Sequence, residues 1–259
     1  MNSQVEIFNK IKEALITSCS DALYFSDNET HLIDAEYLVT VNTAKAIKEL
    51  NNYFGTPYKI YLEHDTKNFS TACTPLIGKK LANNFMGYSS VLRSKNNTER
   101  TGKIDIAIYK TYNSIDIPLC AIEIKGFNPS KKNIIEDLKR NAEYFMFTSP
   151  TGASQLSFTI FIALHSYKNT LSDKKCEMNI GKVRKRYERY IKEIELLSKL
   201  NHTIDLFTIR RGVVPAPSDP YIKEMGLEGN EDYHFIGAIL LTCKESKEEE
   251  SINRNKKSY

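Results

Sequence analysis

The sequence lacks any stretch that is long and apolar enough to cross a membrane. Its longest apolar runs, at 158–164 and 235–241, fall far short of the roughly 20 residues that a membrane helix needs. The N-terminal segment MNSQVEIFNKIKEAL has no basic region followed by an apolar block, so a secretory signal is not expected. We therefore expect a soluble, cytoplasmic protein without membrane contact.

The sequence contains few cysteines, and they are not spaced in pairs. The five cysteines stand at positions 19, 73, 120, 176 and 243, with no C-x-x-C pair. An odd number of scattered cysteines is not typical of a disulfide framework or of a structural zinc site. We expect reduced thiols and no zinc.

A strong excess of one charge is also missing. The chain has 36 basic and 32 acidic side chains, which gives a net charge of +4. This balance is too even to identify a nucleic-acid partner, and ordinary solubility explains mild basicity equally well. Without a repeat or a clear linker, and with 41% apolar residues, the sequence predicts a single domain over 1–243. We expect the charged segment 244–259 to be a disordered tail.

Hydrophobic periodicity predicts a mixed α/β fold, in which helices flank a central sheet. The expected helices cover 1–18, 35–54, 130–147 and 181–200, and the expected strands cover 58–64, 103–109, 118–126, 157–167, 203–209 and 234–241. Ser130 or Asn133 is the expected start of the third helix. The region from 65 to 101 is the least readable, with a short helix at 76–85 and a strand at 88–94 as its expected elements.

Three charged residues interrupt two apolar strands in GKIDIAIYKTYNSIDIPLCAIEIKGF, residues 102–127. Side chains alternate across a strand, so Asp105 lies on one face of the first strand, and Glu123 and Lys125 share one face of the second. A turn near Ser114 leaves Asp105 and Glu123 equally far from it, so antiparallel pairing sets them opposite each other. Cβ atoms of opposed residues are about 4.5–5.5 Å apart.

Two carboxylates this close repel each other unless a proton or a cation lies between them. Hard oxygen ligands suit Mg²⁺ or Mn²⁺ rather than zinc. Lys125, on the same face, could orient an attacking water or stabilise charge on a phosphoryl group. The competing interpretation is a solvent-exposed hairpin face on which Asp105 and Lys125 form a weak surface pair.

In these residues and their context the chain resembles the PD-(D/E)XK nuclease superfamily, the restriction-endonuclease-like fold. GKIDI supplies the acid Asp105, and AIEIKG supplies Glu123 and Lys125. The helix KKNIIEDLKRNAEYFMF and the strand SFTIFIALHSY follow in the order of that family. The resemblance covers roughly residues 30–167. Ile104 stands where the family name has proline.

The resemblance implies Mg²⁺- or Mn²⁺-dependent hydrolysis of phosphodiester bonds. Asp105 and Glu123 would bind the metal with help from the Ile124 carbonyl, and Lys125 would assist the water. Many family members add an acid from the first core helix, for which Glu36 is the best match and Glu63 the rival.

A nuclease also needs a phosphate-binding surface. The candidate basic residues are Lys131, Lys132, Lys139, Arg140, Lys182, Arg184, Lys185, Arg186 and Arg189. Tyr187 and Tyr190 are interleaved with the last five and could stack on bases, although a charged solvent face is the ordinary role of such a helix. His64, His165, His202 and His234 have no ligand spacing and are expected to be structural.

The leading hypothesis is therefore a DNA endonuclease of restriction or phage-defence type. A non-catalytic nucleic-acid-binding or assembly subunit and a ribonuclease on the same scaffold remain open. Beyond nucleic acid, the expected partners are a protein such as a helicase or a second copy in a homodimer.

Overall fold

A computed structural model describes residues 3–25, 35–54, 57–74, 102–112, 115–149, 152–168, 172–213 and 232–244. In chain order the elements are α1 (Ser3–Tyr24), α2 (Glu36–Phe54), β1 (Tyr58–Asp65), α3 (Thr66–Cys73), β2 (Lys103–Tyr112), β3 (Ile115–Phe127), α6 (Lys131–Met146), β4 (Thr148–Ser149), β5 (Gly152–Ala153), β6 (Phe158–Lys168), α7 (Asp173–Lys192), the 3-10 helix η1 (Glu195–Lys199), β7 (Leu200–Val213) and β8 (Asp232–Lys244).

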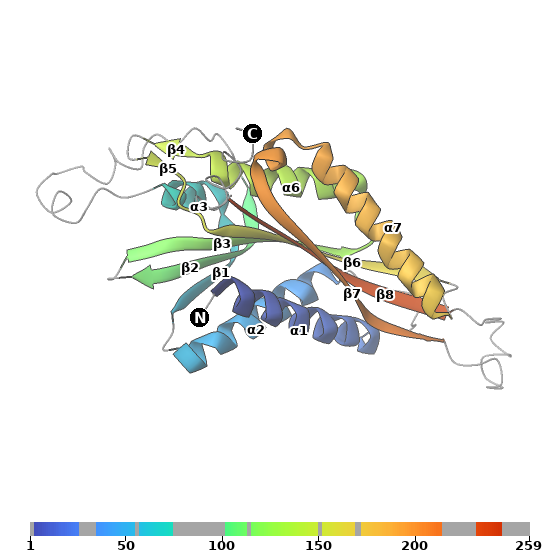
Figure 1. Cartoon of the computed structure of the whole chain (residues 1–259). Helices are drawn as coiled ribbons and strands as arrows, with labels where there is room; N and C mark the ends of the chain where they lie inside the picture. The colour runs from blue at the N-terminus through green and yellow to red at the C-terminus, as the bar shows by residue number, and fades with distance from the viewer. Residues whose placement is uncertain are drawn as a thin grey trace, which may run out of the picture.

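A mixed six-stranded sheet forms the centre, with the strand order β1-β2-β3-β6-β8-β7. Strands β3 and β6 pair in parallel, and the other neighbours pair antiparallel. Helices α1 and α2 cover one face, while α3, α6 and α7 cover the other (Figure 1). The predicted class, a mixed α/β sheet flanked by helices, is confirmed.

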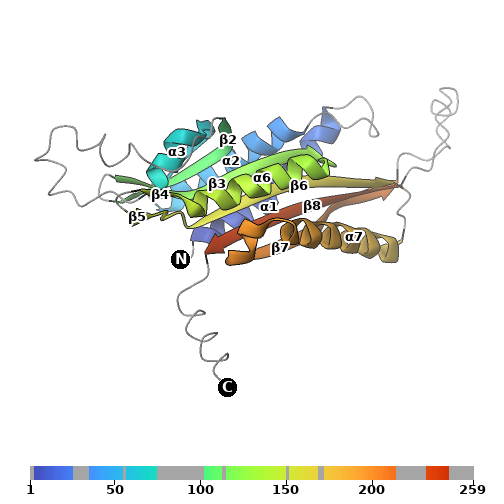
Figure 2. The same ribbon diagram turned by 90° about the horizontal axis from the view of Figure 1, so that it is seen from above.

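Helix α6 crosses over from β3 to β6, as a parallel strand pair requires. It lies above these two strands when the molecule is seen from the α6 side (Figure 2). Ser130 caps its start, because the hydroxyl accepts a hydrogen bond from the backbone N–H of Asn133. Asn141 ties the helix to the sheet by donating to the backbone carbonyl of Ile160. The crossover therefore presents its buried side to β3 and β6.

Each face of the sheet has its own core. Ile106, Ile108, Ile122 and Ile124 pack on the side of α1 and α2, whereas Ala107 and Ala121 pack on the side of α6. Strand β6 is buried on both faces, which explains its continuous apolar run. Ile104 departs from the simple alternation and packs with the α6-side core. The face that carries small alanines is the face where the charged residues of the hairpin lie.

Helix α7 begins and ends about eight residues before the predicted limits of 181 and 200. Its start is set by Ser172, whose hydroxyl accepts from the backbone N–H of Lys175. Gly181, interpreted as the start, lies inside the helix in open space. The last residues of the prediction form η1 and the start of β7.

The structure also adds a helix that the sequence did not predict. Asp65 ends β1 and caps α3 by accepting from the backbone N–H of Asn68. The predicted elements at 76–85 and 88–94 lie outside the described residues, as does the predicted tail from 245 onward. Lys244, where that tail was expected to begin, is the last residue of β8. Among the described helices, none combines the length and hydropathy needed to span a membrane.

Candidate active site

The β2–β3 hairpin brings Asp105 and Glu123 together, as predicted, but by a more complicated path. From Tyr112 opposite Ile115 to Tyr109 opposite Pro118, the two strands pair without interruption. The next pair is Ile108 with Cys120, so the register shifts there by one residue. Beyond this bulge Ala107 pairs with Ala121 and Ile106 with Ile122. The paired residues end at Ile106 opposite Ile122, and Asp105, just beyond, lies close enough to Glu123 for its charge to raise the pKa of that acid. The expected symmetry about Ser114 therefore holds only because β3 contains one extra residue.

Asp105 is held against β3 by a hydrogen bond. Its Oδ2 accepts from the backbone N–H of Ile124 at 2.6 Å. Glu123, one residue before, is 1% exposed, and its Oε1 has no hydrogen-bond partner among the described residues. A buried carboxylate oxygen without a partner is costly, and such groups call for a specific reason.

Lys125 lies between helices from the two opposite layers. Its Nζ is 3.2 Å from Oε1 of Glu36, the first residue of α2, and 3.5 Å from Oδ2 of Asp137 on α6. Of the two acids proposed to complete the site, Glu36 is the one that the structure brings to the hairpin.

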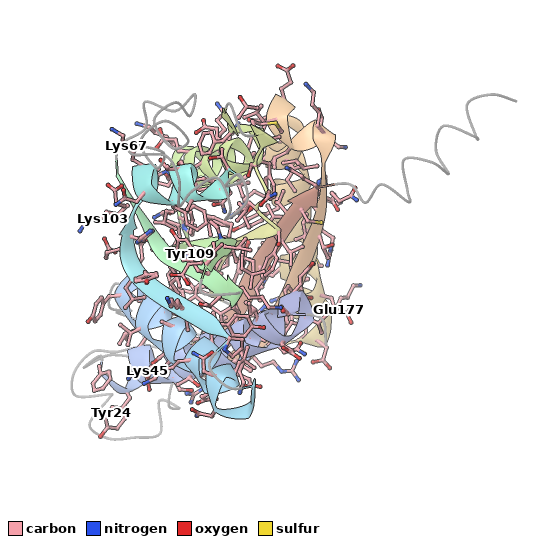
Figure 3. The ribbon with its side chains drawn as sticks, turned by 90° about the vertical axis from the view of Figure 1, so that its left-hand side faces the viewer. Tyr24, Lys45, Lys67, Lys103, Tyr109 and Glu177 are labelled. Carbon is pink, nitrogen blue, oxygen red and sulfur yellow. The ribbon has the colours of Figure 1, made fainter. Side chains whose placement is uncertain are left out.

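Glu63 lies elsewhere. The β1–β2 ladder runs through Leu62 opposite Ile106 and His64 opposite Ile104, and it omits Glu63 and Asp105 between them. Glu63 has a left-handed φ of 48°. Its exposed carboxylate, on the edge strand β1, is 3.7 Å from the Nζ of Lys103, whose side chain points away from the molecule (Figure 3).

Arg140 turns into the site rather than outward. Its Nη1 is 3.6 Å from Oε2 of Glu123 and 3.5 Å from Oδ1 of Asp137. This side chain was predicted to contribute to a phosphate-binding surface on α6, together with Lys131, Lys132 and Lys139. Its guanidinium already serves two buried carboxylates, so its first role is within the charge cluster.

Asp105 and Glu123 have a raised pKa, so they hold their protons more tightly than ordinary acids. Burial raises the pKa of Glu123 to about 8, with further contributions from the charges of Asp105 and Asp137. Burial also raises the pKa of Asp105 to about 6, against the opposing effects of the Ile124 N–H and Lys125. Burial works against the charge of Lys125, but the carboxylates of Asp137 and Glu36 outweigh it and raise its pKa. The acids are thus destabilised as anions, whereas the lysine stays cationic.

The charge count of this cluster fits one divalent cation. Its carboxylates belong to Glu36, Asp105, Glu123 and Asp137, and its cations to Lys125 and Arg140. With all six groups ionised the net charge is −2, from four negative and two positive side chains. A cation bound by Asp105 and Glu123 would balance it, and the partnerless Oε1 of Glu123 offers a ligand atom.

No group of three or more His, Cys, Asp or Glu side chains within the described ranges has the arrangement of a metal site. Mg²⁺ commonly uses only one or two carboxylates and keeps several waters. The donor set here, two opposed carboxylates with hard oxygens, fits that mode of binding. Zinc would require a fuller set of protein ligands.

The predicted basic surface is only partly free. Lys131 pairs with Glu193 and lies over the ring of Tyr190. Lys132 is 82% exposed, with its nearest acid, Glu136, at 3.9 Å, and Lys139 is exposed as well. On α7 the side chains of Lys182, Arg184, Lys185 and Arg189 are exposed, and that of Arg186 is half-buried.

The proposed stacking tyrosines are core residues. Tyr187 is fully buried, and its hydroxyl pairs with Nε2 of His165 at 3.1 Å. Tyr190 is also buried, so the prediction that either stacks on bases is wrong. The side chains of Tyr187 and Tyr190 lie on the buried side of α7 rather than on its solvent side. His64 and His234 likewise pair with hydroxyls, those of Tyr109 and Thr208, in agreement with structural roles.

Asp137 is the site residue that sequence reasoning missed. The signal was present, because Ile134, Leu138 and Ala142 define the buried side of α6 and Asp137 falls on that same side. A carboxylate in an apolar stripe is seldom buried without a partner. That partner is Lys125, whose approach depends on tertiary structure.

The chain was compared with models of protein families, with curated proteins and with solved structures, and none of them matches it. The resemblance found in residues 102–127 and in the order of the following elements therefore stays a prediction. A function has to be argued from the geometry of the charge cluster itself.

Proposed function

We propose that this protein is a metal-dependent nuclease that hydrolyses phosphodiester bonds, with DNA as its substrate. The observation that supports this proposal most strongly is the pair formed by Asp105 and Glu123 on the buried hairpin face, with Lys125 beside it. The order of β2, β3, α6 and β6 supports the comparison with the restriction-endonuclease-like fold.

In this proposal Asp105 and Glu123 would hold one Mg²⁺ or Mn²⁺, together with the backbone carbonyl of Ile124. The bound cation supplies Lewis-acid stabilisation of the phosphoryl charge and a water of lowered pKa. Asp105 is oriented for this role by the Ile124 N–H. Glu123 would hold the cation as a carboxylate, with the buried oxygen that has no hydrogen-bond partner among the described residues as its ligand atom.

Lys125 acts on the reacting group. Lys125 follows Glu123 by two residues on β3. Its ammonium lies near the carboxylates of Glu36 on α2 and Asp137 on α6. A cation at this position orients the attacking water or stabilises the developing charge on the phosphoryl oxygens. Glu36 is 38% exposed and Arg140 34% exposed, so substrate would approach from their side.

The test is incubation of supercoiled plasmid, linear duplex DNA and RNA with Mg²⁺, with Mn²⁺ and with a chelator. Wild type is compared with D105A and K125A. We expect cleavage of DNA that requires the cation and is lost in both variants. Cleavage that survives both substitutions would rule out this site, and cleavage of RNA alone would redirect the proposal to a ribonuclease.

A non-catalytic nucleic-acid-binding or assembly subunit is the second candidate. The observation in its favour is the Arg140 contact with Glu123, because a guanidinium that neutralises this acid permanently would leave no place for a metal. This candidate predicts nucleic-acid binding that is independent of divalent cations and no cleavage by wild type. The same incubations, with a binding assay, distinguish the two.

A further inference from the structure

Asp137 contacts both cations of the charge cluster, Lys125 and Arg140. Its Oδ2 lies 3.5 Å from the Nζ of Lys125 and its Oδ1 3.5 Å from the Nη1 of Arg140. The residue is 4% exposed. It belongs to α6, whose place over β3 is fixed by the Ser130 cap and by the Asn141 bond to β6. Asp137 therefore connects a rigid helix to the ends of two charged side chains.

The two partners of Lys125 differ in what they can hold. Glu36 is 38% exposed and lies in the first turn of α2, where an ion pair competes with water and is weak. Asp137 is enclosed, so its attraction for the ammonium is screened much less. The hydrogen bond of Lys125 goes to Glu36, whereas the buried Oδ2 of Asp137, 3.5 Å from the ammonium, has no hydrogen-bond partner among the described residues and attracts the ammonium by its charge.

We propose that Asp137 is a positioning residue that holds the Lys125 ammonium at the reacting phosphoryl group and keeps Arg140 beside Glu123. This inference rests on the proposed nuclease function. Asp137 does not touch substrate in this scheme. It acts through Lys125, and a small displacement of a reacting group can lower the rate by roughly 100-fold.

A purely structural ion pair explains Asp137 less well. Buried ion pairs are often no more stable than apolar residues of similar volume, because desolvation offsets their attraction. The position lies beside Ile134 and Leu138 in the apolar stripe of α6, where an aliphatic side chain would pack. A carboxylate here has its clearest use in the cations that it holds.

The test uses D137N, which keeps the shape and removes the charge, and E136Q as the matched control. Glu136 is the neighbouring acid on α6, exposed and near Lys132. Two quantities are measured: kcat and KM for DNA cleavage, and the rate at which an amine-acylating reagent modifies Lys125, followed by mass spectrometry of the metal-free protein. The second readout does not depend on activity.

We expect D137N to lower kcat roughly 10- to 100-fold with KM within about twofold, and to raise Lys125 acylation several-fold. E136Q should match wild type in both measurements. If D137N behaves like E136Q in both, the proposal is overturned. If wild type does not cleave DNA, faster acylation in D137N still supports the positioning role while the nuclease function fails, and unchanged acylation overturns the role.

A second measurement covers the case in which D137N does not fold. In E36Q, Lys125 should still react much more slowly than Lys132, an exposed lysine on α6 that serves as the internal reference. Acylation of Lys125 in E36Q at the rate of Lys132 would show that Asp137 does not hold the ammonium, and it would overturn the proposal.

Discussion

The backbone N–H of Ile124 donates to Oδ2 of Asp105 at 2.6 Å, so the strand that carries Glu123 also orients the acid opposite it. The two carboxylates consequently belong to one rigid hairpin. Ligands that keep their positions without the cation lose little entropy when it binds.

The contribution of Glu123 to the stability of the metal-free protein should fall as the pH rises from about 4.5 to about 8. The pKa of Glu123 is raised from 4.5 to about 8, so across this window the folded protein keeps a proton that the unfolded chain releases. The contribution of Glu123 to the free energy of unfolding then decreases by at most about 1.4 kcal/mol per pH unit. Urea unfolding of wild type and E123Q in chelator measures it.

The slope in that window should be smaller in E123Q than in wild type, whereas E136Q should keep the wild-type slope. Equal slopes in wild type and E123Q would show that Glu123 is not the group that retains the proton.

Metal binding should release protons. At pH 7 Glu123 is mostly protonated, because its pKa is about 8, so binding of Mg²⁺ or Mn²⁺ should release about one proton per cation. Above pH 9 the release should approach zero and the affinity should be higher. Calorimetry in buffers of different ionisation enthalpy measures the proton count. A count of zero at pH 7 would contradict the exchange.

The cap of α6 should matter for stability and, through α6, for activity. S130A removes the hydroxyl that accepts from the Asn133 N–H and should lower the free energy of unfolding by about 1 kcal/mol. S130T, which keeps a hydroxyl acceptor, should lose much less. Thermal or urea unfolding of the two variants checks this prediction, and equal losses would contradict the capping role.

An exposed lysine near the start of α6 should contact phosphate. K132A should weaken binding to DNA and reduce the slope of log K against log salt by about 1. The control K48A removes an exposed lysine of α2, on the opposite layer. Binding of labelled duplex DNA at several salt concentrations checks the prediction. An effect of K48A equal to that of K132A would mean that contact is not localised to the α6 side.

The sequence was sufficient to predict the hairpin and the approach of Asp105 to Glu123, because strand alternation is a local property; Ile104, which packs in the α6-side core, does not follow that alternation. The sequence did not predict the bulge between Ile108 and Tyr109, which shifts the register by one residue to the one expected around Ser114. The α7 start was misplaced because Gly181 was taken as a boundary and the Ser172 cap was overlooked.

The remaining site residues could be predicted only in part. Glu36 was chosen from a family pattern, and its approach to Lys125 depends on how α2 packs on the sheet. Asp137 and Arg140 come from a helix on the other face, and no local rule relates them to Lys125. Tyr187 was misjudged because one charged face of α7 concealed a second, buried face.

The most direct test of the metal-dependent site is the rate at which the protein nicks supercoiled plasmid in Mg²⁺, for wild type, E123Q and E63Q. Glu63 is the control, because it is an acid of the neighbouring strand β1 that pairs with Lys103 outside the cluster. The account predicts that E63Q nicks like wild type and that E123Q is slower by about 100-fold or more. Nicking by E123Q at the wild-type rate would contradict it.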